Sequence, residues 1–218
     1  MRIRSTLFLA TALVFAPLAA FAATPSFTAT GGIAALYGNG TAPDLGAIMP
    51  SATSQLKIDD NDVAFTASFA WNINDAWALE AWMTWPSQRN INIDLGNDQH
   101  VLAASYDVRP VMLSMQYQFP KMAQRYRPFA GVGWQWTRTS NEAVAPGQEQ
   151  LQPFQVHGDD GLAAVAGLDI DVGNNWIVRG DVRFLDSSVA TTTGNRPDVT
   201  MKNSANTMVY GASVGYRF

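Results

Sequence analysis

The sequence predicts an all-β protein: an eight-stranded antiparallel up-and-down transmembrane β-barrel of the outer-membrane type. Eight segments alternate, residue by residue, between apolar and small or polar side chains, which gives each strand two unlike faces. Long polar loops and short turns follow one another between these segments, as in outer-membrane barrels. The last segment, 208–218, has a long apolar face and ends on Phe218. Such an edge promotes aggregation in an open sheet, whereas pairing with the first strand closes a barrel and removes the edge.

The amino-terminal segment, residues 1–22, is expected to be a secretory signal peptide. It begins with Arg2 and Arg4, continues as an apolar run over 7–15, and reaches the small-residue cleavage pattern Ala20-Phe-Ala. The apolar run is too short for a membrane anchor, and no later stretch approaches the roughly 18 apolar residues of a transmembrane helix. Residues 23–218 are then the outer-membrane β-barrel.

The eight expected strands are bounded by turn and loop residues. They cover 27–37, 63–73, 77–85, 111–119, 130–137, 162–170, 176–185 and 208–218. Asn, Asp and Gly make tight turns at 74–76 and 173–175, and 120–128 is a short basic connector. Long loops rich in Gly, Pro and Asp cover 38–62, 86–107, 138–161 and 186–205. Because no helical period of 3.6 competes after the signal segment, we expect no helix in the barrel.

The distribution of lysine indicates which strand face points outward. A soluble barrel covers its exterior with charged side chains, but Lys57, Lys121 and Lys202 are the only lysines and all fall in expected loops or turns. The less apolar strand face consists mainly of Ala, Gly, Ser, Thr and Gln, which suits the crowded interior of an eight-stranded barrel. The aromatic face is therefore expected to contact outer-membrane lipid and lipopolysaccharide.

Aromatic side chains at both ends of the expected strands support a membrane position. Amphipathic rings anchor at the two interfaces of a bilayer and form two girdles around a barrel. The expected girdle residues are Trp71, Trp77, Trp176 and Phe218 beside the short turns, and Trp85 and Trp136 at the loop ends.

Charge and histidine content exclude several function classes. The chain has a net charge of −4, which becomes −6 without the two arginines of the signal segment, so nucleic acid is not an expected partner. His100 and His157 fall in expected loops without the spacing of a metal pair or a serine–histidine–acid set. The acidic run 59–62 lacks the spacing of an EF-hand loop. We therefore expect no enzyme activity, no cofactor and no metal site.

Six charged side chains fall on the lumen face of the expected strands. They are Glu80, Asp169, Arg179, Asp181, Arg183 and Arg217. Charges at membrane depth are costly and either pair with one another or line a pathway. They could form a polar plug that closes the barrel, or a path for polar solutes. Because an eight-stranded barrel has little free lumen, we favour the plug.

Six apolar side chains are exceptions on the same lumen face. They are Trp82, Met112, Val165, Ile177, Leu185 and Val209. They could line a hydrophobic channel, or they could simply fill space inside a narrow barrel. The sequence favours neither alternative.

Several short motifs resemble the OmpW family of small outer-membrane proteins. These are the closing motif 213–218 (SVGYRF), the segment 126–133 (YRPFAGVG), the strand motif 77–81 (WALEA), and Gly167-Leu-Asp followed by Asn175-Trp176. Their order and the loop spacing agree over 27–218. The resemblance implies a narrow, largely hydrophobic channel that passively admits small hydrophobic ligands across the outer membrane of a Gram-negative bacterium and releases them sideways into the bilayer.

The carboxyl terminus and the alternative function complete these expectations. The ending on Phe218 resembles the closing strand of Gram-negative barrels, which implies recognition by the barrel-assembly machinery. The alternative to a channel is an OmpA-like structural or adhesion barrel, with a sealed lumen and extracellular loops that interact with other surfaces. A continuous apolar lumen path favours the channel, and a salt bridge spanning the barrel favours the sealed alternative.

Overall fold

The computed structural model describes residues 26–40, 55–59, 61–94, 100–146, 154–158, 160–186, 188–193 and 201–218. The expected signal peptide, residues 1–22, lies outside the described residues and stays a prediction. No helix in the described part of the chain is long and apolar enough to cross a membrane.

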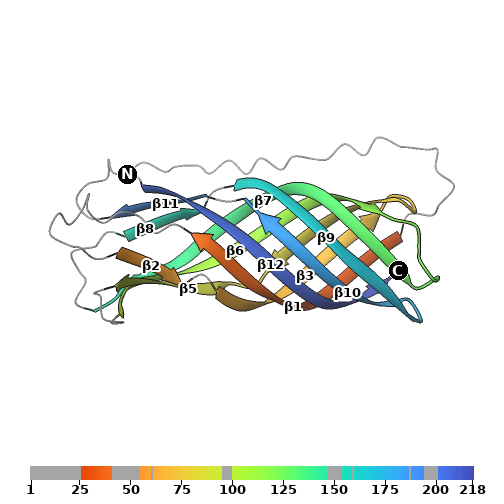
Figure 1. Ribbon diagram of the computed structural model, residues 1–218, viewed down its shortest axis with the longest axis horizontal. Coiled ribbons are helices and arrows are strands. Elements are labelled where there is room, and N and C mark those ends of the chain that lie inside the picture. Colours follow the sequence, from red (N-terminus) through yellow and green to blue (C-terminus); the bar gives the residue numbers. More distant parts are fainter. Residues whose placement is uncertain are drawn as a thin grey trace, which may run out of the picture.

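Eight long strands form a closed antiparallel barrel (Figure 1). In sheet order they are β1 (Ser26–Gly40), β3 (Asn61–Asn72), β4 (Trp77–Thr84), β6 (His100–Gln118), β7 (Tyr126–Val144), β9 (Asp160–Gly173), β10 (Trp176–Leu185) and β12 (Met201–Arg217). The last strand closes the barrel against the first, in a register that runs from Thr28 opposite Arg217 to Gly40 opposite Ala205. The predicted eight-stranded up-and-down barrel is confirmed.

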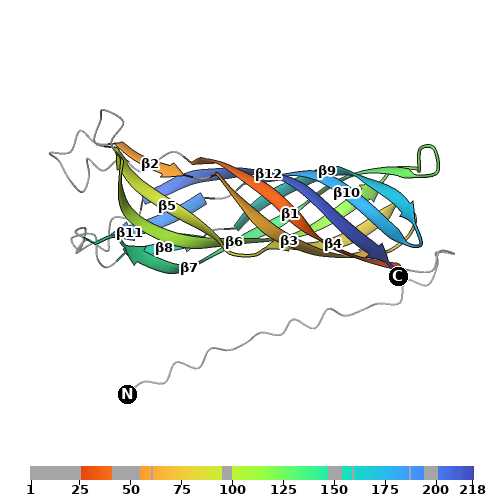
Figure 2. The same cartoon turned by 90° about the horizontal axis from the view of Figure 1, so that it is seen from below.

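Four short strands extend the barrel at the end far from the carboxyl terminus (Figures 1 and 2). They are β2 (Gln55–Asp59), β5 (Ser87–Asp94), β8 (Phe154–Gly158) and β11 (Ser188–Thr193). Strand β5 pairs with both β2 and β6, and β11 pairs with both β8 and β12. The long loops predicted here are therefore partly wrong, and His100 and His157 lie in strands rather than loops.

The extension escaped prediction because alternation marks only strands with one face in lipid. Beyond the bilayer the outer face meets water, and a strand needs no apolar outer face there. The end of β7 illustrates this, since Thr139, Ser140, Asn141 and Glu142 are all polar and yet belong to the strand. Strand β6 likewise begins at His100 rather than at residue 111.

Burial alternates along the strands as the period of two requires. Strand β10 is the clearest case, because every second side chain is buried, starting from Ile177. Between these, Val178, Val182 and Phe184 are exposed on the outer face. An apolar exterior around a buried polar interior is the arrangement of a barrel surrounded by lipid.

The expected girdle residues lie on this outer face at both ends of the barrel wall. Trp77, Trp85, Trp136, Trp176 and Phe218 are exposed, and Trp71 is half-buried. On the short-turn side, two chains of edge-to-face rings run Trp77–Tyr117–Phe119 and Trp176–Tyr216–Phe218, with centroids 5.0–5.2 Å apart. Edge-to-face pairs of this spacing are stabilising, so the rings form continuous patches at one interface.

The first and the last described residues of the barrel both lie beside the short turns. The amide of Phe218 donates to the carbonyl of Phe27 at 2.7 Å, and Ser26 is paired with Asn72 beside the first turn. In outer-membrane barrels the short turns face the periplasm and the long connections face the cell exterior. The end that holds Phe218 is called the periplasmic end below.

Candidate functional site

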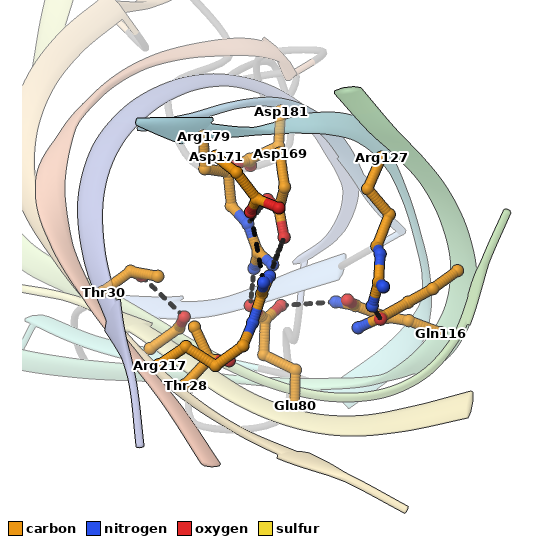
Figure 3. Close-up of polar contacts among 12 residues, drawn as sticks. Thr28, Thr30, Glu80, Gln116, Arg127, Asp169, Asp171, Arg179, Asp181 and Arg217 are labelled. Atoms are coloured by element: carbon orange, nitrogen blue, oxygen red, sulfur yellow. Dashed lines mark hydrogen bonds and ion pairs between the residues drawn. The ribbon is translucent and has the colours of Figure 1, made fainter. Parts of the chain in front are cut away.

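The lumen holds the charged side chains in one continuous network, here called the charged layer (Figure 3). It comprises Glu80, Gln116, Asp169, Arg179, Asp181 and Arg183, all of which are buried. These residues come from β4, β6, β9 and β10, and the period of two directs their side chains inward.

Glu80 is the centre of the charged layer and is 0% exposed. Its Oε2 accepts from Nη1 of Arg183 at 2.9 Å and from Nε2 of Gln116 at 2.6 Å, and its Oε1 accepts from Nη1 of Arg179. In the closed order of eight strands, β4 and β10 lie four places apart, so they stand on opposite walls. These salt bridges therefore span the barrel.

Two aspartates complete the pairing on the β9–β10 wall. Asp169 accepts from Nε and Nη2 of Arg179 at 2.6 and 2.9 Å, and Asp181 accepts from Nε of Arg183 at 2.8 Å. Arg217 reaches Asp169 at 3.8 Å from the periplasmic side. The six charges named from the sequence thus meet in one network, in which three carboxylates balance three arginines.

The sequence did not predict the positions of several other charged residues in this region. Asp171 accepts from Nη1 of Arg217 at 3.1 Å and also pairs with Lys121. Asp171 lies two positions after Asp169 and therefore faces the same side of the strand, but the predicted strand ends at residue 170. Arg127 was assigned to the connector, whereas β7 begins at Tyr126 and places it in the barrel wall.

Aromatic rings support both buried arginines. The guanidinium carbon of Arg179 lies 4.5 Å from the centroid of the Phe129 ring, and that of Arg183 lies 4.6 Å from the Trp82 ring. Phe129 has room because Gly167 faces it: a Cβ at Gly167 would come within 2.6–2.8 Å of the ring. Desolvated cation–π contacts of this kind are attractive and replace part of the water that the two guanidinium groups have lost.

A hydrophobic layer packs against the charged layer, and most of it lies towards the extracellular end. Its buried side chains are Ala34, Leu36, Ala64, Trp82, Met112, Phe129, Ala163, Val165, Leu185 and Val209. Trp82 follows Glu80 by two positions along β4, and Leu185 follows Arg183 by two along β10, both away from the periplasmic turns. Five of the six apolar lumen residues named from the sequence meet here.

The sixth residue, Ile177, lies apart from the hydrophobic layer. It is paired in register with Asp171 and Gly215, on the periplasmic side of the charged layer. The five that meet are at most 4% exposed, so they pack against one another at this level. A protein interior packed in this way is as dense as an organic crystal.

The barrel wall has a break next to the hydrophobic layer. Strand β3 pairs with β4 as far as Thr66 opposite Thr84, with one further bond from the Trp85 amide to the Phe65 carbonyl. Pairing resumes between Asp59 and Asn90. Among the described residues between these points, no ladder pair joins 61–64 to 86–89. Pro86 contributes to the break because its ring restricts φ away from the values of an extended strand.

A polar cavity of about 210 Å³ occupies the periplasmic mouth of the barrel, here called the vestibule. Its lining residues are Ser26, Asn72, Asn74, Asp75, Lys121, Arg127 and Arg217. The lumen therefore changes from polar to charged to apolar between the periplasmic end and the extracellular end. Within the described residues, no group of three or more His, Cys, Asp or Glu could hold a metal ion.

A closed antiparallel barrel with an aromatic exterior and a buried, charge-paired interior defines an outer-membrane β-barrel protein. Residues 26–218 match the OmpW family. The chain belongs to that family, as its motifs predict, and its location is the outer membrane of a Gram-negative bacterium.

Two curated relatives are similar to this chain in sequence. The chain is 29% identical to the dibenzothiophene metabolism operon protein PahQ of Pseudomonas aeruginosa over 126 residues, which are 58% of this chain and 56% of PahQ. It is 23% identical to the outer membrane protein AlkL of Ectopseudomonas oleovorans over 175 residues, which are 79% of this chain and 72% of AlkL. The match to PahQ thus spans little more than half of that relative.

Solved structures agree on the fold. The crystal structure of OprG from Pseudomonas aeruginosa has a TM-score of 0.71 at 18% identity and covers 90% of this chain and 97% of OprG. The solid-state NMR structure of AlkL in DMPC bilayers has a TM-score of 0.66 at 20% identity and covers 91% of this chain and 92% of AlkL.

Proposed function

We propose that this protein is a non-catalytic conduit that passively moves small hydrophobic molecules across the lipopolysaccharide leaflet. In this proposal the molecules enter from the cell exterior, pass along the hydrophobic layer, and leave sideways through the wall beside Pro86. The membership of the OmpW family supports a channel for such molecules. The name of PahQ adds that one relative belongs to an operon for the metabolism of dibenzothiophene, a flat apolar compound.

The observation that carries the proposal is the break in the wall at the level of the hydrophobic layer. Ala64 belongs both to the buried hydrophobic layer and to the stretch of β3 that pairs with β1 but has no described ladder partner on its other edge. At this point only the wall strand β3 separates a molecule in contact with this layer from the lipid. Trp85, an exposed girdle residue, borders the same break, so the exit lies near the outer interface of the bilayer.

The charged layer supports a sideways exit over an axial one. An apolar molecule that moved straight down the barrel would have to separate Glu80 from Arg179 and Arg183. Breaking a buried ion pair leaves uncompensated charge in a low dielectric, which is strongly unfavourable. The wall, in contrast, has backbone groups at 61–64 for which no ladder partner on the β4–β5 side is found among the described residues.

Two hydroxyl groups beside Pro86 bear on which molecules pass. The side-chain oxygens of Thr84 and Ser87 are buried and have no hydrogen-bond partner among the described residues. Buried polar groups are normally satisfied, and an exception calls for an explanation such as a ligand or water. We expect the conduit to accept molecules that are mostly apolar but carry one polar atom.

The test compares uptake in cells of a Gram-negative host without an OmpW-family protein of its own. Cells that produce this protein are expected to take up radiolabelled dibenzothiophene faster than cells with an empty vector. Pro86→Ala removes the restraint on φ and lets residues 86–89 adopt an extended conformation that can pair with β3, so its uptake rate should fall towards that of the empty vector. Pro120→Ala, at an exposed turn position, is the matched control and should retain the wild-type rate.

The spanning salt bridge is the observation that favours the second candidate, a sealed structural or adhesion barrel. Glu80 and the two arginines join opposite walls, which is the feature we associated with that alternative. The uptake assay separates the two candidates. Equal uptake by producing and non-producing cells, with folded barrel present in the outer membrane, would exclude the conduit and leave the sealed barrel.

A further inference from the structure

We propose that the vestibule at the periplasmic end binds an oxyanion, either a carboxylate or a phosphate group, and that Arg127 is its principal ligand. The vestibule lies on the opposite side of the charged layer from the hydrophobic layer. The proposal is therefore independent of the conduit, and either can fail without the other.

Arg127 differs from the other arginines inside the barrel in its partners. Arg179, Arg183 and Arg217 each pair with at least one carboxylate. Among the described residues, Arg127 has no ion-pair partner, and its Nη1 donates only to the neutral Oε1 of Gln118 at 2.7 Å. Its Nε is buried and has no hydrogen-bond acceptor in the same part of the chain. A half-buried guanidinium with an unused donor is a place for an anion.

The neutral polar side chains around Arg127 are already engaged with one another. Asn72 donates to Thr28 and Ser26 and accepts from Gln118. The side-chain oxygen of Asn74 accepts from two backbone amides of its own turn. Among the described residues, none of these groups accepts from the Nε of Arg127, so a ligand that accepts hydrogen bonds would satisfy it.

The charges in the vestibule lead to the same ligand class. Lys121, Arg127 and Arg217 line the cavity together with the single carboxylate of Asp75. The nearby carboxylate of Asp171 is occupied on both oxygens, by Lys121 and by Arg217. Lys121 and Arg217 are thus paired with Asp171, so Arg127 is the cation of the vestibule without an ion-pair partner among the described residues, and a carboxylate or phosphate would supply one.

The geometry of the cavity suits a small oxyanion. Figure 3 shows Arg127 and Arg217 extending from opposite sides into the barrel interior. A guanidinium presents parallel N–H groups that match two oxygens of a carboxylate or phosphate, and Lys121 adds a point charge at the mouth. The anion could be free in the periplasm or could be the phosphate of a lipid headgroup in the inner leaflet.

The test follows the Nε–H resonance of Arg127 by NMR in the full mature protein, refolded in phosphate-free octyl glucoside micelles. Inorganic phosphate and acetate are titrated separately at constant ionic strength set with chloride. Both are expected to shift this resonance saturably, while that of Arg179, within the charged layer, stays unchanged. A shift that chloride reproduces, or that never saturates, would overturn the proposal.

Two variants locate the site. Arg127→Gln, followed through the Nε–H resonance of Arg217 in the same cavity, should weaken the apparent affinity for phosphate about ten-fold or more, since it removes a charge-assisted hydrogen bond. Arg138→Gln, an exposed position on the same strand β7, is the matched control and should bind as the wild type does. Unchanged affinity of Arg127→Gln would contradict the assignment. The wild-type NMR titration keeps the proposal testable if this variant does not fold.

A last arm separates the two sources of the anion. Short-chain phosphatidylglycerol is added to the micelles before the phosphate titration. Competition with inorganic phosphate would identify a lipid headgroup as a ligand, and its absence would identify a free anion. Either result is compatible with the site, whereas no saturable response to phosphate, acetate or phosphatidylglycerol would exclude it.

Discussion

The guanidinium carbon of Arg183 lies 4.6 Å from the centroid of the Trp82 ring, at the boundary between the charged layer and the hydrophobic layer. The same guanidinium donates to Glu80 and Asp181, and its Nη1 lies 3.8 Å from the sulfur of Met112. One face of Arg183 is thus paired with carboxylates while the other is covered by an indole. The apolar part of the lumen can therefore meet a full positive charge without water between them.

Trp82→Ala is expected to lower the free energy of unfolding by about 3–5 kcal/mol, because it leaves a cavity in a closely packed layer. It also uncovers one face of Arg183. Trp82→Phe keeps an aromatic ring over the guanidinium and should be much milder. The measurement is reversible urea unfolding in detergent micelles, followed by the fluorescence of the other tryptophans. Equal stability of Trp82→Ala and the wild type would show that the layer is loosely packed.

Glu80→Ala is expected to destabilise the barrel by about 3–5 kcal/mol, since it leaves two buried arginines without a shared carboxylate. Glu80→Gln keeps the shape of the side chain and tests the charge itself. The same urea titration gives both values. Asp186→Asn, at an exposed position directly after β10, is the matched control and should unfold like the wild type.

A change of less than about 1 kcal/mol for Glu80→Gln would contradict the electrostatic account. That result is typical of exposed ion pairs, which contribute little. It would mean that the charged layer is held by packing and neutral hydrogen bonds, such as the one from Gln116 to Glu80.

The period of two predicted that the six charges within the expected strands face the lumen, because parity along a strand follows from the backbone alone. It could not predict which charges pair. Glu80 meets Arg179 and Arg183 from 99 and 103 residues away, and that contact depends on the strand order and on the stagger of the closed barrel. The same stagger separates Ile177 from the other apolar lumen residues.

Two further features were beyond the sequence for local reasons. Pro86 was identified as a strand end, but the break in the wall depends on where β2 and β5 resume pairing in an expected loop. Phe129 precedes the predicted strand by one residue, and its place under Arg179 depends on the missing side chain of Gly167 on the neighbouring strand. Sequence shows the glycine but not the ring that faces it.

Gly167→Val is therefore expected to disturb the charged layer. A Cβ at Gly167 would collide with the Phe129 ring and with the backbone oxygen of Gly180, so the ring must move away from Arg179. Gly180→Val is the matched control on the paired strand, because a Cβ there meets nothing within 4 Å. The folded fraction, measured by heat-modifiable migration in gels, should fall for Gly167→Val alone. Equal folded fractions for both variants would show that Phe129 can be repositioned at little cost.

The last prediction concerns Phe218, which we expect the barrel-assembly machinery to recognise. Its amide is engaged with Phe27, but its side chain is 68% exposed and is the end of an aromatic chain with Tyr216. Phe218→Ala should therefore reduce the amount of folded barrel in the outer membrane of producing cells while leaving refolding in detergent nearly unchanged. Tyr117→Ala removes a ring from the equivalent girdle chain and is the control for lost aromatic packing. A parallel loss of folding in cells and in detergent would mean that Phe218 acts through stability, and only a loss confined to cells supports recognition.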